Sequence, residues 1–218
     1  MSSSEYSITP VFQIGNPSSI LLFHLPVRSP FHYHGFDMAT ISCLGGLTLK
    51  CTFGKTDFII FPATQGKAGP EGTVTLFAHP DEQPAERTIS WPGEYDFNGI
   101  YVRGLGHEEG RQVSYGISAD NVRCLFLSTP LHALSDVELE WIGDIDILVM
   151  PIDDVKITQN LLDVVDPRVF VPLANKDDKA FQEILKICGA VGKEAVDEYK
   201  AKSLPAEGRE VVLLRGKK

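Results

Sequence analysis

The stretch that decides the fold of this chain is Leu139-Glu-Trp-Ile-Gly-Asp-Ile-Asp-Ile-Leu-Val-Met-Pro-Ile152. From Ile145 to Pro151 it is apolar except for Asp146, and such a nearly continuous run is typical of a strand that is buried on both faces. A second run of the same kind is Val169-Phe-Val-Pro-Leu173. These runs predict two interior strands in the last third of the chain.

Helix signals surround these two strands. Ser135-Asp-Val-Glu138 is a capping box, in which the serine hydroxyl and the glutamate carboxylate satisfy free amides of the first helical turn. The pattern predicts three helices: one from this box to about Trp141, one from Thr158 or nearby to Val165, and one over Lys179–Cys188, which Gly189 ends. With a last strand at Glu210–Leu214, the final third follows an αβαβ order.

The chain before this region is rich in strand signals. Short runs of β-branched and aromatic residues are separated by turn residues, and a hairpin is expected across Ala119-Asp-Asn121. The predicted strands are Ala39–Ser42, Leu47–Phe53, Asp57–Pro62, Thr73–Ala78, Gly99–Gly104, Gln112–Ser118 and Val122–Leu127. The chain is therefore β-rich first and alternates helix and strand later.

Two further segments, together with the opening stretch, resemble a known family. Asp166-Pro-Arg-Val-Phe-Val-Pro172 covers the second interior strand, and Pro92-Gly-Glu-Tyr-Asp-Phe-Asn-Gly-Ile100 is similar to a P-G-E-Y-E-V-x-G-V segment. Over residues 39–215 the chain resembles metallo-β-lactamase-fold hydrolases, closest to the bacterial branch that includes the ascorbate-phosphate lactonase-like proteins. The resemblance implies an α+β fold, an αββα sandwich of two mixed β-sheets with outer helices.

Residues 1–37 have no counterpart in that resemblance. They carry four prolines, several serines and the pair His32-Tyr-His34, which could hold a metal but is more typical of a mobile leader. We therefore expect a flexible N-terminal extension at residues 1–37 and a metallo-β-lactamase-like domain at residues 38–218.

Composition excludes several classes of function. A net charge of −9 argues against a nucleic-acid or anionic-membrane partner, both of which attract basic surfaces. No run of 18 apolar residues and no signal peptide are evident. The four cysteines are widely spaced without a C-x-x-C pair, so we expect reduced core thiols and a cytoplasmic location; these are Cys43, Cys51, Cys124 and Cys188.

The stretch Thr73-Val-Thr-Leu-Phe-Ala-His-Pro-Asp-Glu82 looks like part of a metal-binding loop. Active members of the resembled family hold two zinc ions with an H-x-H-x-D-H loop, a third histidine, a bridging aspartate and a last histidine. Matched on His79 and Asp81, the loop carries Phe77 in place of the first imidazole and Glu82 in place of the last. In the alternative register, His79 is the first ligand and the later ones are lost.

The more distant positions depart further from the family pattern. His107 lies near the third histidine, whereas Thr129 stands at the bridging aspartate and Ala174 at the last histidine. Phe61 replaces another aspartate. None of the three replacements is an ordinary zinc donor, and most of the second metal's ligands are therefore missing.

Two functions follow from this ligand set. The first is a non-catalytic member of the fold that binds a small molecule or a protein, with self-association among its expected partners. The alternative is a hydrolase of a small phosphorylated or lactone-like substrate that works through one zinc or iron ion. The residual metal ligands would be His79, Asp81, Glu82 and His107; we expect no cofactor if the first reading holds. His132, Glu94 and Cys124 are interpreted as structural residues.

Overall fold

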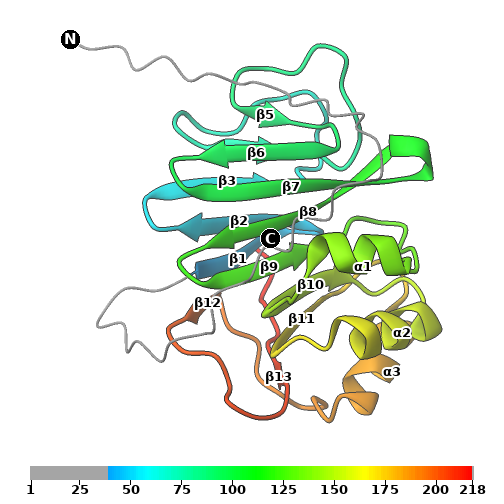
Figure 1. Cartoon of the computed structure of the whole chain (residues 1–218). Helices are drawn as coiled ribbons and strands as arrows, with labels where there is room; N and C mark the ends of the chain where they lie inside the picture. Colours follow the sequence, from blue (N-terminus) through cyan, green and yellow to red (C-terminus); the bar gives the residue numbers. More distant parts are fainter. Residues whose placement is uncertain (1–38, 218) are drawn as a thin grey trace, which may run out of the picture.

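The structure is a computed structural model that describes residues 39–217. The extension expected at residues 1–37, with its His32-Tyr-His34 pair, lies outside the described residues. Within them, two mixed β-sheets lie face to face, the blue and cyan strands of the first behind the green strands of the second (Figure 1). The predicted two-sheet architecture is confirmed.

The first sheet has six strands in the order β12-β1-β2-β3-β4-β5. The pairs β12–β1, β1–β2 and β2–β3 are antiparallel, whereas β3–β4 and β4–β5 are parallel. Its strands are β1 (Ala39–Gly45), β2 (Thr48–Phe53), β3 (Thr56–Ile60), β4 (Val74–Leu76), β5 (Thr88–Ile89) and β12 (Glu198–Ala201). Burial alternates along β1 and β2, so this sheet packs on the core with one face.

The second sheet has seven strands in the order β13-β11-β10-β9-β8-β7-β6. The strands β9, β10, β11 and β13 are parallel, and the hairpins of β6 to β9 are antiparallel. Its strands are β6 (Gly93–Phe97), β7 (Ile100–His107), β8 (Gln112–Ala119), β9 (Val122–Phe126), β10 (Ile147–Pro151), β11 (Val169–Leu173) and β13 (Glu210–Val211). Every residue of β10 and β11 is buried, which confirms the two interior strands.

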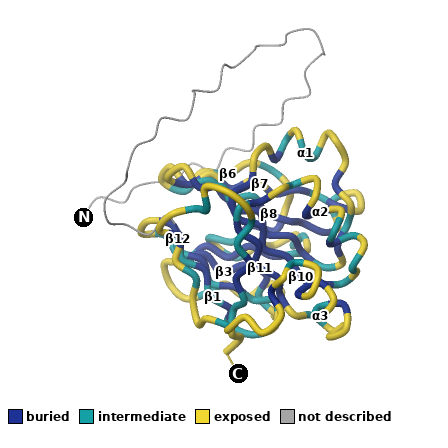
Figure 2. The backbone as a smooth tube through the Cα atoms, turned by 90° about the horizontal axis from the view of Figure 1, so that it is seen from below, coloured by how far each residue is buried: buried dark blue, intermediate teal, exposed yellow. Residues whose placement is uncertain are grey.

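Three α-helices within residues 39–217 cover the outer face of the second sheet: α1 (Asp136–Ile142), α2 (Val155–Val165) and α3 (Asp178–Ile187). A short 3₁₀ turn, η1 (Glu108–Gly110), joins β7 to β8. Figure 2 shows the buried segments gathered in the strands, with the three helices on one side of them. No described helix is long and apolar enough to cross a membrane.

Two apolar clusters hold these layers together. One lies between the sheets and includes Phe53, Phe58 and Tyr115, all fully buried; the other joins the second sheet to the helices. The ring centroids of Phe53 and Phe58 lie 5.9 Å apart in an edge-to-face arrangement, which adds to their burial. The second sheet therefore packs against an apolar cluster on each of its faces.

Several predicted boundaries differ from those of the structure; the last strand, for example, ends at Val211 and not at Leu214. Helix α2 begins at Val155 because the Asp154 side chain accepts a hydrogen bond from the amide of Ile157, and Thr158 is a buried helical residue rather than the cap. Glu94 belongs to strand β6 and is not in a turn. The capping box of α1 is confirmed, with both reciprocal hydrogen bonds formed between Ser135 and Glu138.

Candidate functional site

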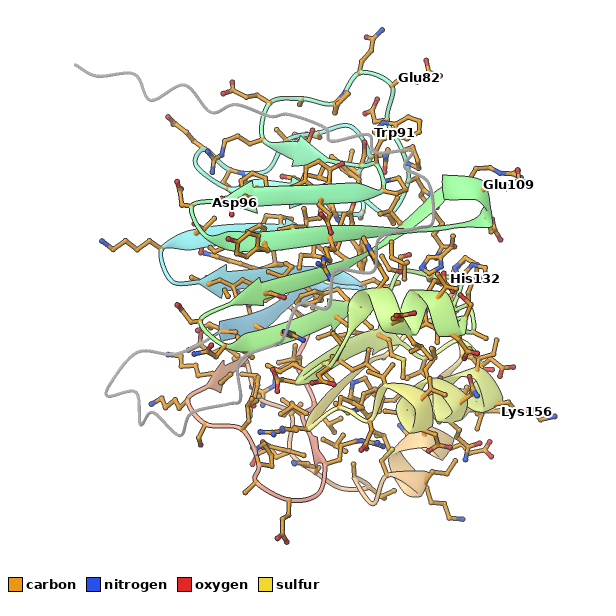
Figure 3. The ribbon with its side chains drawn as sticks, in the orientation of Figure 1. Glu82, Trp91, Asp96, Glu109, His132 and Lys156 are labelled. Atoms are coloured by element: carbon orange, nitrogen blue, oxygen red, sulfur yellow. The ribbon has the colours of Figure 1, made fainter. Side chains whose placement is uncertain are left out.

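The loops that follow several strands meet at one edge of the sandwich. Because β9, β10 and β11 are parallel, their carboxyl ends lie at the same edge. The loop after β4 joins them, since the amide of Val113 donates to the carbonyl of Ala78 over 2.8 Å. Figure 3 shows Trp91, Glu109 and His132 along this side of the molecule. We call it the loop edge; it comprises residues 77–92, 107–112, 127–135, 152–154 and 174–177.

The end of β10 is tied to its two neighbours by Asp153. Its carboxylate accepts hydrogen bonds from the hydroxyl of Thr129 at 2.7 Å, from the amide of Leu131 at 3.2 Å and from the side-chain amide of Asn175. The Asn175 amide also lies 3.5 Å from the Thr129 hydroxyl. Direct hydrogen bonds thus close the space between the ends of β9, β10 and β11.

A second polar network is buried beside this one. Gln112 donates to the hydroxyl of Ser128 over 2.7 Å and to the carbonyl of Pro130 over 2.9 Å, and its amide oxygen lies 2.9 Å from Nε2 of His132. The Ser114 hydroxyl lies 3.2 Å from that of Ser128 and accepts from the Ser128 amide. These side chains satisfy one another, as buried polar groups must.

Two histidines end this network and stack on each other. His107 is 7% exposed, and its Nε2 lies 2.9 Å from the Ser114 hydroxyl. The ring centroids of His107 and His132 are 5.3 Å apart and their planes are inclined by 21°. Nδ1 of His107 lies 3.7 Å from Glu138, and Nε2 of His132 lies 3.8 Å from Glu108.

Burial controls the ionisation of this cluster. Burial lowers the pKa of His107 below its ordinary value; Glu138 and Glu108 oppose the shift, and the neighbouring His132 adds to it. Burial raises the pKa of Glu138, but hydrogen bonds from Ser135 and the nearby histidines outweigh burial and lower it overall. The lowered pKa keeps the His107 imidazole neutral near pH 7.

We expect acidification to destabilise the protein through His107. Its folded pKa lies below the ordinary 6.5, so its contribution is complete above pH 6.5 and is lost as pH falls through the folded pKa. The stabilising contribution of Glu138 is lost only as the pH falls below the ordinary glutamate pKa of 4.5. Urea unfolding should give a lower free energy of unfolding at pH 5.5 than at pH 7.5. For one proton, this free energy can change by at most about 1.4 kcal/mol per pH unit.

The matched variants for this experiment are His107→Gln and His79→Gln. In His107→Gln, the free energy of unfolding should change less between pH 7.5 and 5.5 than in the parent. In His79→Gln, at an exposed imidazole, it should change as in the parent. A parent and a His107→Gln variant with the same slope would show that this imidazole is not responsible.

Hydrogen bonds between side chains and the backbone hold the loop with the predicted ligands His79 and Asp81. Nδ1 of His79 lies 3.2 Å from the carbonyl of Arg111, and the Asp81 carboxylate accepts from the amide of Gln83 at 2.9 Å. The Trp91 indole donates to the Asp81 carbonyl over 2.8 Å. The loop is therefore ordered by contacts that need no ion.

The predicted ligands are distributed over two places. His79, Asp81 and Glu82 share the loop after β4, where His79 and Glu82 are exposed, and Figure 3 shows Glu82 pointing outward. His107 is buried in the histidine network and faces Glu138 instead. Among residues 39–217, no group of three or more His, Cys, Asp or Glu side chains is placed to hold a metal ion.

Aromatic side chains occupy two positions at which the resemblance to the family predicts metal ligands. Phe77 is 1% exposed and Phe61 is 9% exposed, and the ring of Phe61 lies 6.0 Å from that of Tyr115. The Tyr115 hydroxyl donates to the carbonyls of Phe77 at 2.7 Å and Ile89 at 3.1 Å, and so links the two sheets. Neither phenylalanine ring can supply a donor to a metal ion.

Sequence reasoning did not identify the residues that form the two networks. They are Gln112, Ser114, Ser128, Asp153 and Asn175. One signal was available: Ser128, Asp153 and Asn175 follow the ends of apolar strand runs, where polar side chains from separate loops converge.

Comparisons with known proteins bear on the fold. A protein from Thermotoga maritima, provisionally named a zinc-dependent hydrolase of the metallo-β-lactamase superfamily, is 19% identical, with a TM-score of 0.65 over 81% of this chain and 98% of its own. The metallo-β-lactamase-fold protein YhfI from Bacillus subtilis is 7% identical, with a TM-score of 0.56 over 83% and 97%. A provisionally named metal-dependent hydrolase from Parabacteroides distasonis is 13% identical, with a TM-score of 0.55 over 82% and 94%.

No family model and no curated protein matches the chain by sequence. The structural likenesses extend over most of this chain and nearly all of each neighbour, and they include both mixed sheets. Identities below one fifth carry the architecture without the activity. Two mixed sheets face to face, with outer helices and a loop edge at the strand ends, give this chain the metallo-β-lactamase fold.

Proposed function

We propose that this chain is a non-catalytic protein of the metallo-β-lactamase fold that acts by binding a small molecule or another protein. The observation that carries the proposal is the hydrogen-bonded closure of Thr129, Asp153 and Asn175 across three strand ends. In this fold, hydrolysis needs donors at those ends that converge on metal and leave a position open for water.

The residues present do not fit a two-zinc centre. Zinc takes about four donors from cysteine, histidine or carboxylate. At the loop edge, Asp153 is occupied by three donors, and Thr129 and Asn175 supply a hydroxyl and an amide. The buried rings of Phe61 and Phe77 add no ligand. We therefore assign no reaction step to a metal in this chain.

The partner and the location belong to the same proposal. We propose that the partner is a small molecule, another protein or a second copy of this chain. We also propose a cytoplasmic location. The cysteines support that setting, because within the described residues they are free thiols, three of them buried: Cys43, Cys51 and Cys124. The alternative, a single-metal hydrolase, is favoured by one observation, the proximity in one loop of His79, Asp81 and Glu82.

We expect metal removal to leave the protein unchanged. The chain, purified without chelator and exposed to excess zinc, iron or manganese, should retain far less than one ion per molecule after gel filtration. Its thermal unfolding should be the same with and without EDTA, because the loop edge is closed by protein groups. Elemental analysis and calorimetry measure both quantities.

Two double variants are compared with the parent. The first combines His79→Ala and Asp81→Ala, and the control combines Glu86→Ala and Glu109→Ala, at two exposed carboxylates. Near-stoichiometric metal in the parent and in the control, lost in the His79 and Asp81 variant, would replace this proposal with the single-metal hydrolase. Equal, low metal content in all three proteins is the expected result.

A further inference from the structure

A hollow of ≈ 530 Å³ lies on the outer face of the second sheet, away from the histidine network. It is bounded by β7, β8 and β9 and by the carboxyl-terminal end of α1. Of the described helices, α1 borders the hollow with residues 140–142, and β6 and β7 lie beside it at one end of the sheet (Figure 1). Its main lining residues are Tyr101, Arg103, Gly116, Ser118, Arg123 and Trp141.

Small residues on β8 create the hollow. Gly116 pairs with Arg103 on one side and with Leu125 on the other, and Ser118 pairs with Tyr101. A Cβ at position 116 would meet only the Cβ of Arg103, at 4.0 Å, which is ordinary contact. The glycine is therefore not required by the sheet, since a larger side chain could be accommodated and would fill the space.

One wall of the hollow is fixed by Arg103. Its guanidinium donates to the carbonyl of Trp141 at 2.7 Å and lies 5.4 Å from the centroid of the indole. Its Nε lies 3.1 Å from the carboxylate of Glu94, which neutralises its charge. These contacts hold the Arg103 and Trp141 side chains together, and Tyr101, which is 61% exposed, lies on the same strand as Arg103.

Arg123 supplies a second positive charge to the lining of the hollow. Its backbone amide donates to Asp146, but its guanidinium has no hydrogen bond or ion pair to any residue between 39 and 217. The guanidinium reaches the end of α1, because a Cβ at Gly143 would lie 3.3 Å from its Nη1. The other carboxylate of the lining, Glu140, is exposed on α1.

We infer that this hollow binds a small molecule that joins a flat aromatic ring to an anionic group, a carboxylate or a phosphate. The ring would lie against Tyr101 and the Arg103–Trp141 pair, and the anion would pair with Arg123. The volume is within the range of small-ligand sites, about 300–1,000 Å³. A guanidinium binds either anion through paired hydrogen bonds. The inference does not depend on whether the loop edge is catalytic.

The test uses the two tryptophans of the ¹⁵N-labelled full chain. The indole N–H of Trp141 reports on the hollow, and that of Trp91, which donates to Asp81 at the loop edge, reports on the other site; Trp91→Phe assigns the signals. The probes are phenyl phosphate and benzoate, with inorganic phosphate and benzyl alcohol as the anion and the ring alone. We expect a saturable shift of Trp141 with an aromatic anion and none for Trp91.

Variants locate the binding. Arg123→Ala should lower the affinity for the aromatic anion by about tenfold or more, because a hydrogen bond to a charged group is lost. The affinity of Arg123→Lys should lie between that of Arg123→Ala and that of the parent. Gly116→Val, which suits a strand and fills the hollow, should abolish the shift. Arg111→Ala, at an exposed arginine outside the hollow, is the matched control and should bind like the parent.

Four results would overturn the inference. In the first, the indole N–H signal of Trp141 does not shift with millimolar phenyl phosphate or benzoate; in the second, it shifts equally with inorganic phosphate or benzyl alcohol. In the third, the signal of Trp91 shifts in place of that of Trp141; in the fourth, the titration of Trp141 is unchanged in Arg123→Ala and Gly116→Val. The metal experiment decides the proposed function separately, because neither variant touches His79 or Asp81.

Discussion

Replacement of Tyr115 by alanine should lower the free energy of unfolding by about 4–6 kcal/mol, the largest effect we expect from a single substitution. Loss of a buried aromatic ring costs about 3–5 kcal/mol, and buried carbonyls that lose a donor add to this. Tyr115 is fully buried between the sheets, and its hydroxyl donates to the carbonyls of Phe77 and Ile89 in the opposite sheet. Urea unfolding followed by circular dichroism measures the change.

Tyr115→Phe separates the hydroxyl from the ring. It should cost only about 1–2 kcal/mol, because the ring still fills its site and the Ile89 carbonyl keeps its bond from the Phe77 amide. Tyr101→Ala, at an exposed tyrosine of the neighbouring strand, is the control and should change stability by about 0.5 kcal/mol or less. If Tyr115→Ala cost no more than Tyr101→Ala, the two sheets would not depend on this contact.

Continuous apolar runs were sufficient to predict the interior strands. The range Val169–Leu173 is the same in the prediction and in β11, because a strand covered on both faces has no polar position that could blur its ends. The capping box at Ser135 was equally informative, since its two hydrogen bonds are local in sequence. Signals of this kind do not depend on the rest of the fold.

Competing local signals explain the boundary errors. Asp154 and Thr158 are both plausible caps, and packing decides between them by burying Thr158 in the helix–sheet interface. Pro92-Gly93 has the composition of a turn, yet Gly93 begins β6 opposite Gly104. A side chain at position 104 would come within 2.8 Å of the Trp91 carbonyl, so this close pairing requires glycine and is visible only in three dimensions.

The sequence indicated which positions differ from the resembled family, but it did not indicate the hydrogen-bond networks of the loop edge. Substitutions at Phe61, Phe77 and Thr129 could be identified from the sequence because the resemblance supplies the expected ligand at each position. The hydrogen bond between Asp153 and Asn175 could not be identified in this way, since these residues lie 22 positions apart and meet only when β10 and β11 pair. Tertiary pairing, not local pattern, determines this part of the loop edge.

Asp153→Ala should be the second most damaging substitution, with an expected loss of about 2–4 kcal/mol. It removes the acceptor of three donors: the Thr129 hydroxyl, the Leu131 amide and the Asn175 side chain. Hydrogen bonds to a charged acceptor contribute about 1.5–3 kcal/mol each, although water reaches these half-buried groups and reduces the sum. Urea unfolding measures the total, and hydrogen exchange of the Leu131 amide measures the local opening.

Asp154→Ala is the matched control, because the neighbouring carboxylate only caps α2 through the amide of Ile157. It should cost about 1 kcal/mol and leave the Leu131 amide protected. A structural role for Asp153 also differs from a metal-binding role in one measurable way. If Asp153 held an ion, EDTA would deprotect Leu131 in the parent as the substitution does; if it holds the strand ends together directly, only the substitution will expose that amide.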